Sequence, residues 1–246
     1  MNYFKTDKNI QIHYKFLPKK NKPTLIFIHG LALDHTCWQH FIENLKGDCG
    51  ILCFDLRGHG LSSKPRKKRE YQIKNFVDDS EKLIKHLKIK DFYLIGHSLG
   101  GLISSELNNR IKPNATILIS TPIDLKDVSI PFYSLVKIII LIPKHILKIF
   151  ATKKNYSDIK GLLKLYIKCL SKFSASRALK IISNIKRFKG LAKINNSCII
   201  ISKYDEIIKN HITQIYPEYI EMKGTHFAPI RDYEKTITII KKFIKK

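Results

Sequence analysis

The fold of this chain is decided by one short segment, Gly96-His97-Ser98-Leu99-Gly100-Gly101. An apolar run, Phe92 to Ile95, precedes it, and apolar residues spaced by three or four positions follow it from Leu99 to Arg110. The segment therefore predicts a buried strand, a sharp turn and a helix. Gly96 and Gly100 lack the side chains that would collide with the strand and the helix in such a turn. Ser98 would stand at its apex.

Short apolar and β-branched runs recur on both sides of that turn, separated by segments of helical length. The expected strands are Ile10 to Phe16, Thr24 to Ile28, Ile51 to Phe54, Phe92 to Ile95, Ala115 to Ile119, Cys198 to Ile201 and Pro217 to Met222. The expected helices are Thr36 to Lys46, Ile73 to Leu87, Leu99 to Arg110 and Tyr233 to Ile244. Continuous apolar strands that alternate with helices predict an α/β fold, with a mostly parallel sheet covered by helices on both faces.

One stretch, residues 124–193, breaks this alternation. It has no convincing strand, and it carries 16 Lys or Arg residues against 3 Asp. Lys160, Lys164, Lys168 and Lys172 recur every four residues, which places them on one face of an amphipathic helix. We expect residues 124–193 to form a helical cap inserted between two strands, and residues 1–123 and 194–246 to form the core domain.

The composition fits a globular protein built around one large domain. The chain has 246 residues, of which 44% are hydrophobic and 26% charged. It begins without an apolar leader, and no apolar run approaches the roughly 20 residues that a membrane helix needs, so a cytoplasmic location is expected. The five cysteines form no C-x-x-C pair, which favours buried, reduced thiols. No metal and no organic cofactor are expected.

A serine hydroxyl becomes a nucleophile when a base lies within hydrogen-bond reach and a carboxylate orients that base. His226 follows the last expected strand, and Asp205 follows the strand before it, where open α/β sheets place their sites. The chain order Ser98, Asp205, His226 is the order typical of a serine nucleophile on such a turn. His211 stays open as a rival base and Asp124 as a rival acid.

An oxyanion formed on such a serine needs two backbone N–H donors. Leu99 would supply one from the first turn of its helix. Leu31 would supply the other from the loop after the Thr24 to Ile28 strand, because Gly30 allows that loop to pass close to the serine. His29, Gly30 and His97 flank these positions and are predicted to contact a substrate.

Four separated blocks carry a resemblance to a known family. They are Phe27-Ile28-His29-Gly30-Leu31 with Trp38 downstream, Asp55-Leu56-Arg57-Gly58-His59-Gly60-Leu61-Ser62, Gly96 to Gly101, and Lys203-Tyr204-Asp205 with Gly224-Thr225-His226-Phe227. In this order, over nearly the whole chain, they resemble the α/β-hydrolase superfamily, in its esterase and lipase branch with a helical cap. The resemblance implies that the block from Asp55 is a structural turn. Ser202 and Thr225 depart from it, since relatives usually carry glycine at both positions.

The resemblance implies a serine hydrolase that cleaves carboxylic esters or thioesters of an apolar acyl group through an acyl-enzyme. Haloalkane dehalogenases and epoxide hydrolases of this fold use an aspartate at the turn, so Ser98 argues against both. An acyl-carrier-protein methyl ester esterase, a cofactor-free haloperoxidase and a carbon–carbon bond hydrolase stay open on the same residues. A ligand-binding protein without turnover also stays open, because fold and function are separable.

The charge balance is strongly basic, with 45 Lys or Arg against 20 Asp or Glu and a net charge of +25. No nucleic-acid motif accompanies this charge, so no nucleic-acid partner is expected, and an A- and T-rich genome would explain the abundance of lysine. The basic cap would suit an anionic membrane surface or an acidic acyl carrier protein. A solvated basic face without any partner is slightly favoured over both. A small-molecule ester is the expected substrate.

Overall fold

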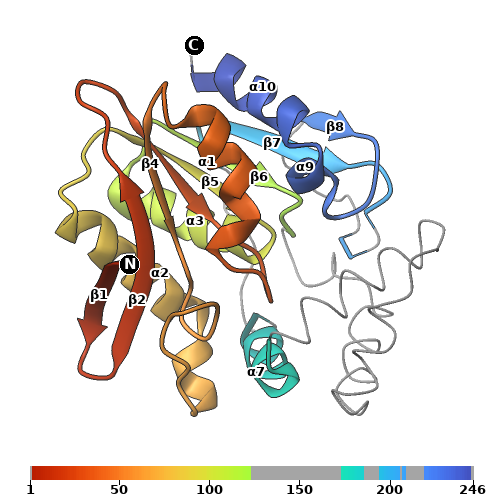
Figure 1. Cartoon of the computed structure of the whole chain (residues 1–246). Helices are drawn as coiled ribbons and strands as arrows, with labels where there is room; N and C mark the ends of the chain where they lie inside the picture. The colour runs from red at the N-terminus through yellow and green to blue at the C-terminus, as the bar shows by residue number, and fades with distance from the viewer. Residues whose placement is uncertain (1, 123–172, 186–193, 206, 209–218, 245–246) are drawn as a thin grey trace.

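The computed structural model describes residues 2–122, 173–185, 194–205, 207–208 and 219–244. Its centre is a mixed sheet in which eight strands follow the order β1-β2-β4-β3-β5-β6-β7-β8 (Figure 1). The strands are β1 (Asn2–Asp7), β2 (Ile10–Leu17), β3 (Thr24–Ile28), β4 (Gly50–Phe54), β5 (Phe92–His97), β6 (Ala115–Ile119), β7 (Ser197–Ser202) and β8 (Ile220–Met222). The pairs β1–β2 and β2–β4 are antiparallel, and all the other neighbours are parallel. The predicted mostly parallel sheet is confirmed.

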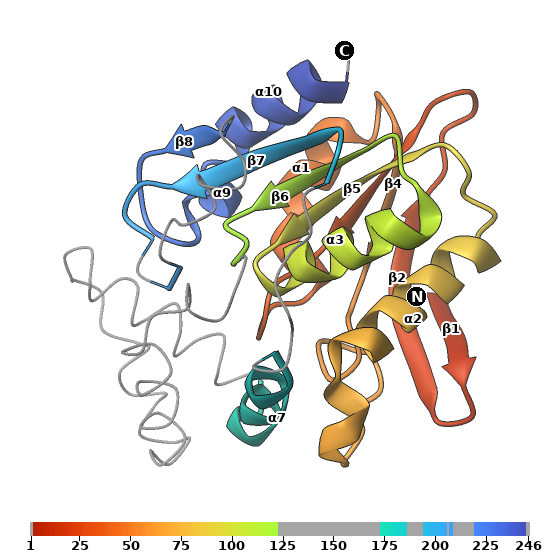
Figure 2. The same ribbon diagram turned by 180° about the vertical axis from the view of Figure 1, so that it is seen from behind.

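Helices cover both faces of this sheet (Figures 1 and 2). The helices of the described residues are α1 (Gln39–Leu45), α2 (Ile73–His86), α3 (Leu99–Ile111), α7 (Ala175–Ile185), α9 (Ala228–Arg231) and α10 (Tyr233–Ile244), with short 3₁₀ helices η1 (His35–Trp38) and η2 (Lys68–Tyr71). Of these, α7 lies away from the sheet faces and packs beside η2 (Figure 1). Alternate residues of β3 enter the two cores: Ile26 packs with α2 and α3, whereas Phe27 packs with α1 and α10. Burial on both faces explains why the strand sequence is continuously apolar.

The structure adds one strand that the sequence pattern did not predict. β1 pairs with β2 at the edge of the sheet, and of its six residues only Thr6 is buried. An edge strand with one covered position lacks the apolar run on which strand prediction depends. The last strand is shorter than expected, since it begins at Ile220, while residues 217–218 lie outside the described part.

The expected cap falls largely outside the described residues. Of residues 124–193, the structure describes 173–185, which include α7. Ala178 and Ile181 of this helix are fully buried and join the same apolar cluster as α2 and α3. The domain division, the lysine-bearing helix at 160–172 and the partners of a basic cap stay predictions. Within the ranges that the structure describes, no helix has the length and apolar character needed to cross a membrane.

The parallel strands bring distant loops to one edge of the sheet. β5 ends at His97, β7 at Ser202 and β8 at Met222. Because neighbouring parallel strands point the same way, the loops that follow them emerge at the same edge, which is where ligands bind in open α/β sheets. Ser98, Asp205 and His226 all lie in or just after these loops.

Candidate active site

The turn after β5 holds Ser98 in an uncommon backbone conformation. Its φ is 52° and its ψ is −114°, and it caps α3. A positive φ is costly for a residue with a β-carbon, so the surrounding packing must impose it. A Cβ on Gly96 would lie 2.3 Å from the Gly100 carbonyl oxygen, and a Cβ on Gly100 would lie 2.1 Å from the Ile28 carbonyl oxygen. The two glycines therefore allow α3 to start directly against β5 and β3.

The turn is also tied to the neighbouring strand. The Ser98 backbone N–H donates to the Ile119 carbonyl at the end of β6, with a nitrogen–oxygen distance of 2.9 Å. Leu99 is the first residue of α3, and the first N–H groups of a helix have no intrahelical acceptor. These amides and the positive end of the helix dipole lie beside the half-buried Ser98, where negative charge would develop on an attacked carbonyl.

Asp205 and His226, which are 21 residues apart, form a buried pair. The His226 Nδ1 lies 2.8 Å from the Asp205 Oδ2 and 3.0 Å from its Oδ1. The two side chains are 2% and 1% exposed, respectively. A carboxylate accepts from Nδ1, so the hydrogen bond assigns the proton to Nδ1 and leaves Nε2 as the basic nitrogen. This is the nitrogen that general-base catalysis requires.

Backbone groups hold the Asp205 carboxylate in place. Its Oδ1 accepts from the N–H of Ile207 at 3.0 Å and from the N–H of Ile208 at 2.9 Å. Two backbone donors and one imidazole leave the carboxylate little freedom to rotate, since each hydrogen bond prefers a narrow range of angles. The pair is therefore held in one buried geometry by several hydrogen bonds and is not a mobile surface contact.

The loop that carries Asp205 and the loop that carries His226 are joined to each other by backbone hydrogen bonds. The Lys203 N–H donates to the Met222 carbonyl at 2.8 Å, and the Tyr204 N–H donates to the Gly224 carbonyl at 3.0 Å. Gly224 has a φ of 131°, which residues with a β-carbon rarely adopt. The pairing of β7 with β8 is thus extended into both loops, and this sets the register in which Asp205 meets His226.

The two departures from the family pattern are accommodated locally. The buried Ser202 hydroxyl lies 3.3 Å from the hydroxyl of Ser120, at the ends of neighbouring strands. The Thr225 carbonyl accepts from the Ala228 N–H at 2.8 Å, which opens the turn into α9. Neither substitution interrupts the contact between the acid and the histidine.

His97 connects the loop that carries His226 to the turn that carries Ser98, which is called the nucleophile turn below because of the role expected for Ser98. Its Nε2 donates to the His226 carbonyl at 3.3 Å, and the two imidazole rings lie 4.9 Å apart. Burial, with the charge of His226 as a smaller cause, lowers the pKa of His97 well below its usual value, so the ring stays neutral. Because Ser98 directly follows His97, this contact brings the His226 loop beside the serine.

His29 and Gly30 hold the loop after β3 against the same turn. The His29 Nδ1 donates to the Gly30 carbonyl at 2.8 Å, and its Nε2 accepts from the Leu56 N–H at 3.0 Å. Burial lowers the pKa of His29, in agreement with this neutral, doubly bonded ring. A Cβ on Gly30 would lie 3.3 Å from the Ser98 Cβ. The loop that carries Leu31 therefore touches the nucleophile turn.

The side chains of His29 and His97 occupy interior positions. Both are 0% exposed, so in this structure they position loops and do not face an open site. The expectation that their side chains contact a substrate is not favoured by this placement, whereas Gly30 lies at the contact with Ser98. Asp124 and His211, the rival acid and base, lie outside the described residues.

A second carboxylate–histidine cluster escaped the sequence analysis. The fully buried Asp55 uses Oδ1 to accept from the N–H and the Nδ1 of His35, both at 2.8 Å. Its Oδ2 accepts from the Leu61 N–H at 2.8 Å and lies 3.1 Å from the His13 Nδ1. Only the turn around Asp55 was visible as a motif. The two histidines come from separate segments, and nothing local to them signals the pairing.

The Asp55 cluster is also the place where the described residues gather potential metal ligands. One ligand atom from each of His13, His35 and Asp55 lies within 4.8 Å of the others. Although burial acts to raise it, the pKa of Asp55 lies below its usual range because of the hydrogen bond from His35 and other donors. Four hydrogen bonds already satisfy this carboxylate, so the cluster is explained as a polar network.

Comparison with known proteins shows similarity to hydrolases of the predicted fold. Residues 23–122, which contain the β3 loop and the nucleophile turn, match the family model described as alpha/beta hydrolase fold. Epoxide hydrolase 4 of Mus musculus is 28% identical over 98 residues, which are 40% of this chain and 27% of the relative. 3-Oxoadipate enol-lactonase 2 of Acinetobacter baylyi is 32% identical over 97 residues, 39% of this chain and 36% of the relative. The chain thus spans well under half the length of these relatives.

The whole chain is matched by solved structures. A carboxylesterase structure from Nitrososphaera gargenis superposes with a TM-score of 0.78 at 18% identity, over 99% of this chain and 98% of the other. A hydrolase from Pseudomonas aeruginosa superposes with a TM-score of 0.79 at 14% identity, over 100% of this chain and 98% of the other. The chain therefore has the α/β-hydrolase fold, as its sequence blocks predicted.

Proposed function

We propose that this chain is a serine hydrolase that cleaves carboxylic esters of an apolar acyl group. Ser98 is the nucleophile, His226 is the general base, and Asp205 orients the histidine. The observation that carries this proposal is the buried Asp205–His226 pair, with Nδ1 2.8 Å from the carboxylate. It lies at the sheet edge that also carries the strained Ser98.

The geometry supports a two-step reaction. His226 Nε2 accepts the proton of Ser98 as the serine oxygen attacks the ester carbonyl, and the N–H groups of Leu31 and Leu99 bind the oxyanion. His226 then donates that proton to the leaving alcohol, which completes the acyl-enzyme. Water, activated by the same imidazole, releases the acid and restores Ser98. Each of these steps uses groups of the protein and water alone.

The names of the relatives suggest two classes of substrate, epoxides and lactones. A lactone is a cyclic ester, so an enol-lactonase relative is compatible with acyl transfer through Ser98. An epoxide hydrolase of this fold resembles the chain in its sheet but uses an aspartate where this chain has a serine. The residue at the turn therefore favours an ester, and thioesters remain within the same chemistry.

The proposal is tested by Ser98→Ala. Hydrolysis of p-nitrophenyl butyrate should fall by at least about a thousandfold, because the nucleophile is lost while the fold is kept. Ser105→Ala is the matched control: this buried hydroxyl lies on α3, which Ser98 caps, and it has no hydrogen-bond partner among the described residues, so its loss should leave turnover unchanged. A fluorophosphonate probe should label the native chain and Ser105→Ala only. Undiminished turnover and labelling of Ser98→Ala would refute the proposal, and a ligand-binding protein without catalysis would not be labelled at all.

A further inference from the structure

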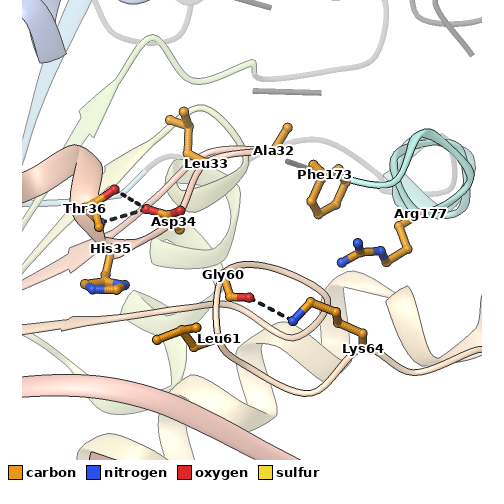
Figure 3. Close-up of a pocket in the computed structure, with 10 residues that line it drawn as sticks. All are labelled: Ala32, Leu33, Asp34, His35, Thr36, Gly60, Leu61, Lys64, Phe173 and Arg177. Carbon is orange, nitrogen blue, oxygen red and sulfur yellow. Dashed lines mark hydrogen bonds between the residues drawn. The ribbon is translucent and has the colours of Figure 1, made fainter. Parts of the chain in front are cut away.

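A pocket lies beside the loop that carries Leu31. Its volume is about 330 Å³, and three segments line it (Figure 3). They are residues 32–36 after β3, Gly60, Leu61 and Lys64 of the turn after β4, and Phe173 and Arg177 at the start of α7. This volume is within the range of small-molecule sites, which start at about 300 Å³. The pocket is therefore large enough for an organic group of a few carbon atoms.

Two cations share one side of this pocket. Figure 3 shows Arg177 and Lys64 together, whereas Asp34 lies at the opposite side beside Thr36. The Lys64 Nζ donates to the Gly60 carbonyl at 2.8 Å and to the Ser62 carbonyl at 3.2 Å. Neither cation has a carboxylate partner among the residues that the structure describes.

The two side chains keep hydrogen-bond donors to spare. Arg177 uses Nη1 to donate to the Gly58 carbonyl, and a guanidinium has five N–H groups in all. Among the described lining residues Asp34 is the single carboxylate, and its Oδ1 accepts from the Thr36 N–H at 2.9 Å. Arg177 and Lys64 therefore keep donors that no carboxylate of the described residues engages.

The electrostatics of the pair favour an added anion. Burial lowers the pKa of both Arg177 and Lys64, and for Lys64 the charge of Arg177 lowers it further. Two like charges that lose water in each other's neighbourhood are destabilised, and a carboxylate between them would relieve both costs. Lys64 remains exposed at the surface, so an anion could enter from solvent on that side.

An aromatic ring of the pocket wall packs against the guanidinium of Arg177. The Arg177 Cζ lies 4.8 Å from the centre of the Phe173 ring, and Phe173 stacks on His59 with a centroid distance of 4.4 Å. A guanidinium over an aromatic face loses less freedom when it binds a carboxylate. Ala32, Leu33 and Leu61 also line the pocket and provide hydrocarbon surface next to the charged end.

The pocket adjoins the proposed catalytic site. Ala32 lines it and follows Gly30 by two residues, which is about 7 Å of backbone at most. Gly30 in turn packs against Ser98. A substrate could place its ester at Ser98 and extend a short carbon chain along the Leu31 loop into the pocket.

We infer that the acyl group of the substrate ends in a carboxylate, which Arg177 and Lys64 bind in this pocket. This inference rests on the proposed hydrolase function. The substrate class is then the monoester of a dicarboxylic acid: an apolar chain with one esterified end and one free acid end. Arg177 and Lys64 are the specificity-determining residues. Hydrolysis itself proceeds through Ser98, His226 and Asp205 as above.

The experiment compares mono-p-nitrophenyl esters of succinic, glutaric, adipic and pimelic acids with neutral p-nitrophenyl esters of the same chain lengths. The native chain should show a higher kcat/KM for the acid ester at one or more lengths. Arg177→Met and Lys64→Met should each lower the ratio of kcat/KM for the acid ester to kcat/KM for the neutral ester at least about tenfold, mainly through the KM of the acid ester. Arg177→Lys should keep part of the preference. Arg110→Gln, which removes a partly exposed arginine paired with Asp78 on α2, is the matched control.

Calorimetric binding of monobenzyl adipate, measured with Ser98→Ala added to each folded variant so that this ester is not cleaved, provides a readout that does not need turnover. Weaker binding to Arg177→Met and Lys64→Met than to Arg110→Gln supports the inference even if the native chain hydrolyses no ester. The lack of hydrolysis would contradict only the hydrolase proposal. Equal rates for acid and neutral esters in the native chain, or equal binding by all variants, would overturn the inference and leave the Ser98 chemistry untouched.

Discussion

The protein contains two buried carboxylate–histidine clusters that are built alike and lie on either side of the nucleophile strand. In the sheet order, β4 and β7 are each two strands away from β5, or about 10 Å. Asp55 follows β4 and Asp205 follows β7, and both emerge at the same edge of the sheet. Each carboxylate accepts two backbone N–H bonds as well as imidazole Nδ1 contacts.

The clusters differ in where the histidine comes from. His226 lies on the loop after β8, which returns to the nucleophile turn and contacts His97. His13 lies on β2 and His35 on η1, so both histidines of Asp55 belong to the framework. With His226 as the base that we propose, the comparison shows what distinguishes the two clusters. The imidazole of His226 lies on a loop that contacts the Ser98 turn, whereas those of His13 and His35 belong to a strand and a 3₁₀ helix.

The largest expected effect separates the two acids by activity. Asp205→Asn should lower kcat for p-nitrophenyl butyrate by about ten-thousandfold, because an amide at this position favours the wrong tautomer of His226. Asp55→Asn should leave kcat per folded molecule within about threefold, since Asp55 touches no proposed catalytic group. Steady-state kinetics, normalised by the folded fraction from circular dichroism, measures both. Equal losses in the two variants would mean that the clusters are not functionally distinct.

The next largest effect is on stability, and here Asp55 is expected to be the important carboxylate. Asp55→Asn should lower the free energy of unfolding by about 2–3 kcal/mol, since the buried carboxylate accepts two backbone N–H groups and two imidazoles. Asp91→Asn, a change at an exposed position, should alter it by less than about 0.5 kcal/mol. Urea unfolding at pH 7.5 gives both values. A stability of Asp55→Asn equal to that of Asp91→Asn would contradict the structural role given to the cluster.

The smallest effect is a pH dependence of the Asp55 cluster. The hydrogen bond to Asp55 raises the pKa of His35 above its usual value, so the folded state binds this proton more tightly than the unfolded state. The resulting stabilisation is complete below the unfolded pKa of 6.5 and is lost as pH rises through the raised pKa. His35→Asn should therefore destabilise more at pH 5.5 than at pH 9, by on the order of 1 kcal/mol. Urea unfolding at the two pH values measures this difference. A larger destabilisation at pH 9 than at pH 5.5 would contradict the raised pKa of His35.

Much of the core was predictable because its causes are local. The predicted helix from Ile73 to Leu87 agrees within one residue with α2, and the strands Thr24 to Ile28 and Ala115 to Ile119 have the predicted bounds. An apolar run or a period of three to four residues is written in consecutive positions, and so are the glycines that shape the nucleophile turn. β1 was missed because an edge strand exposes most of its side chains.

The sequence by itself determined the parallel sheet, the turn that strains Ser98 and the order of serine, acid and histidine along the chain. Only the tertiary structure decided which carboxylate meets which imidazole, across 21 residues for Asp205 and His226 and 42 residues for His13 and Asp55. It also decided that the rings of His29 and His97 are buried and that Lys64 and Arg177 line the same pocket. Local patterns follow from the backbone period, whereas these contacts depend on how separate loops return to one edge of the sheet.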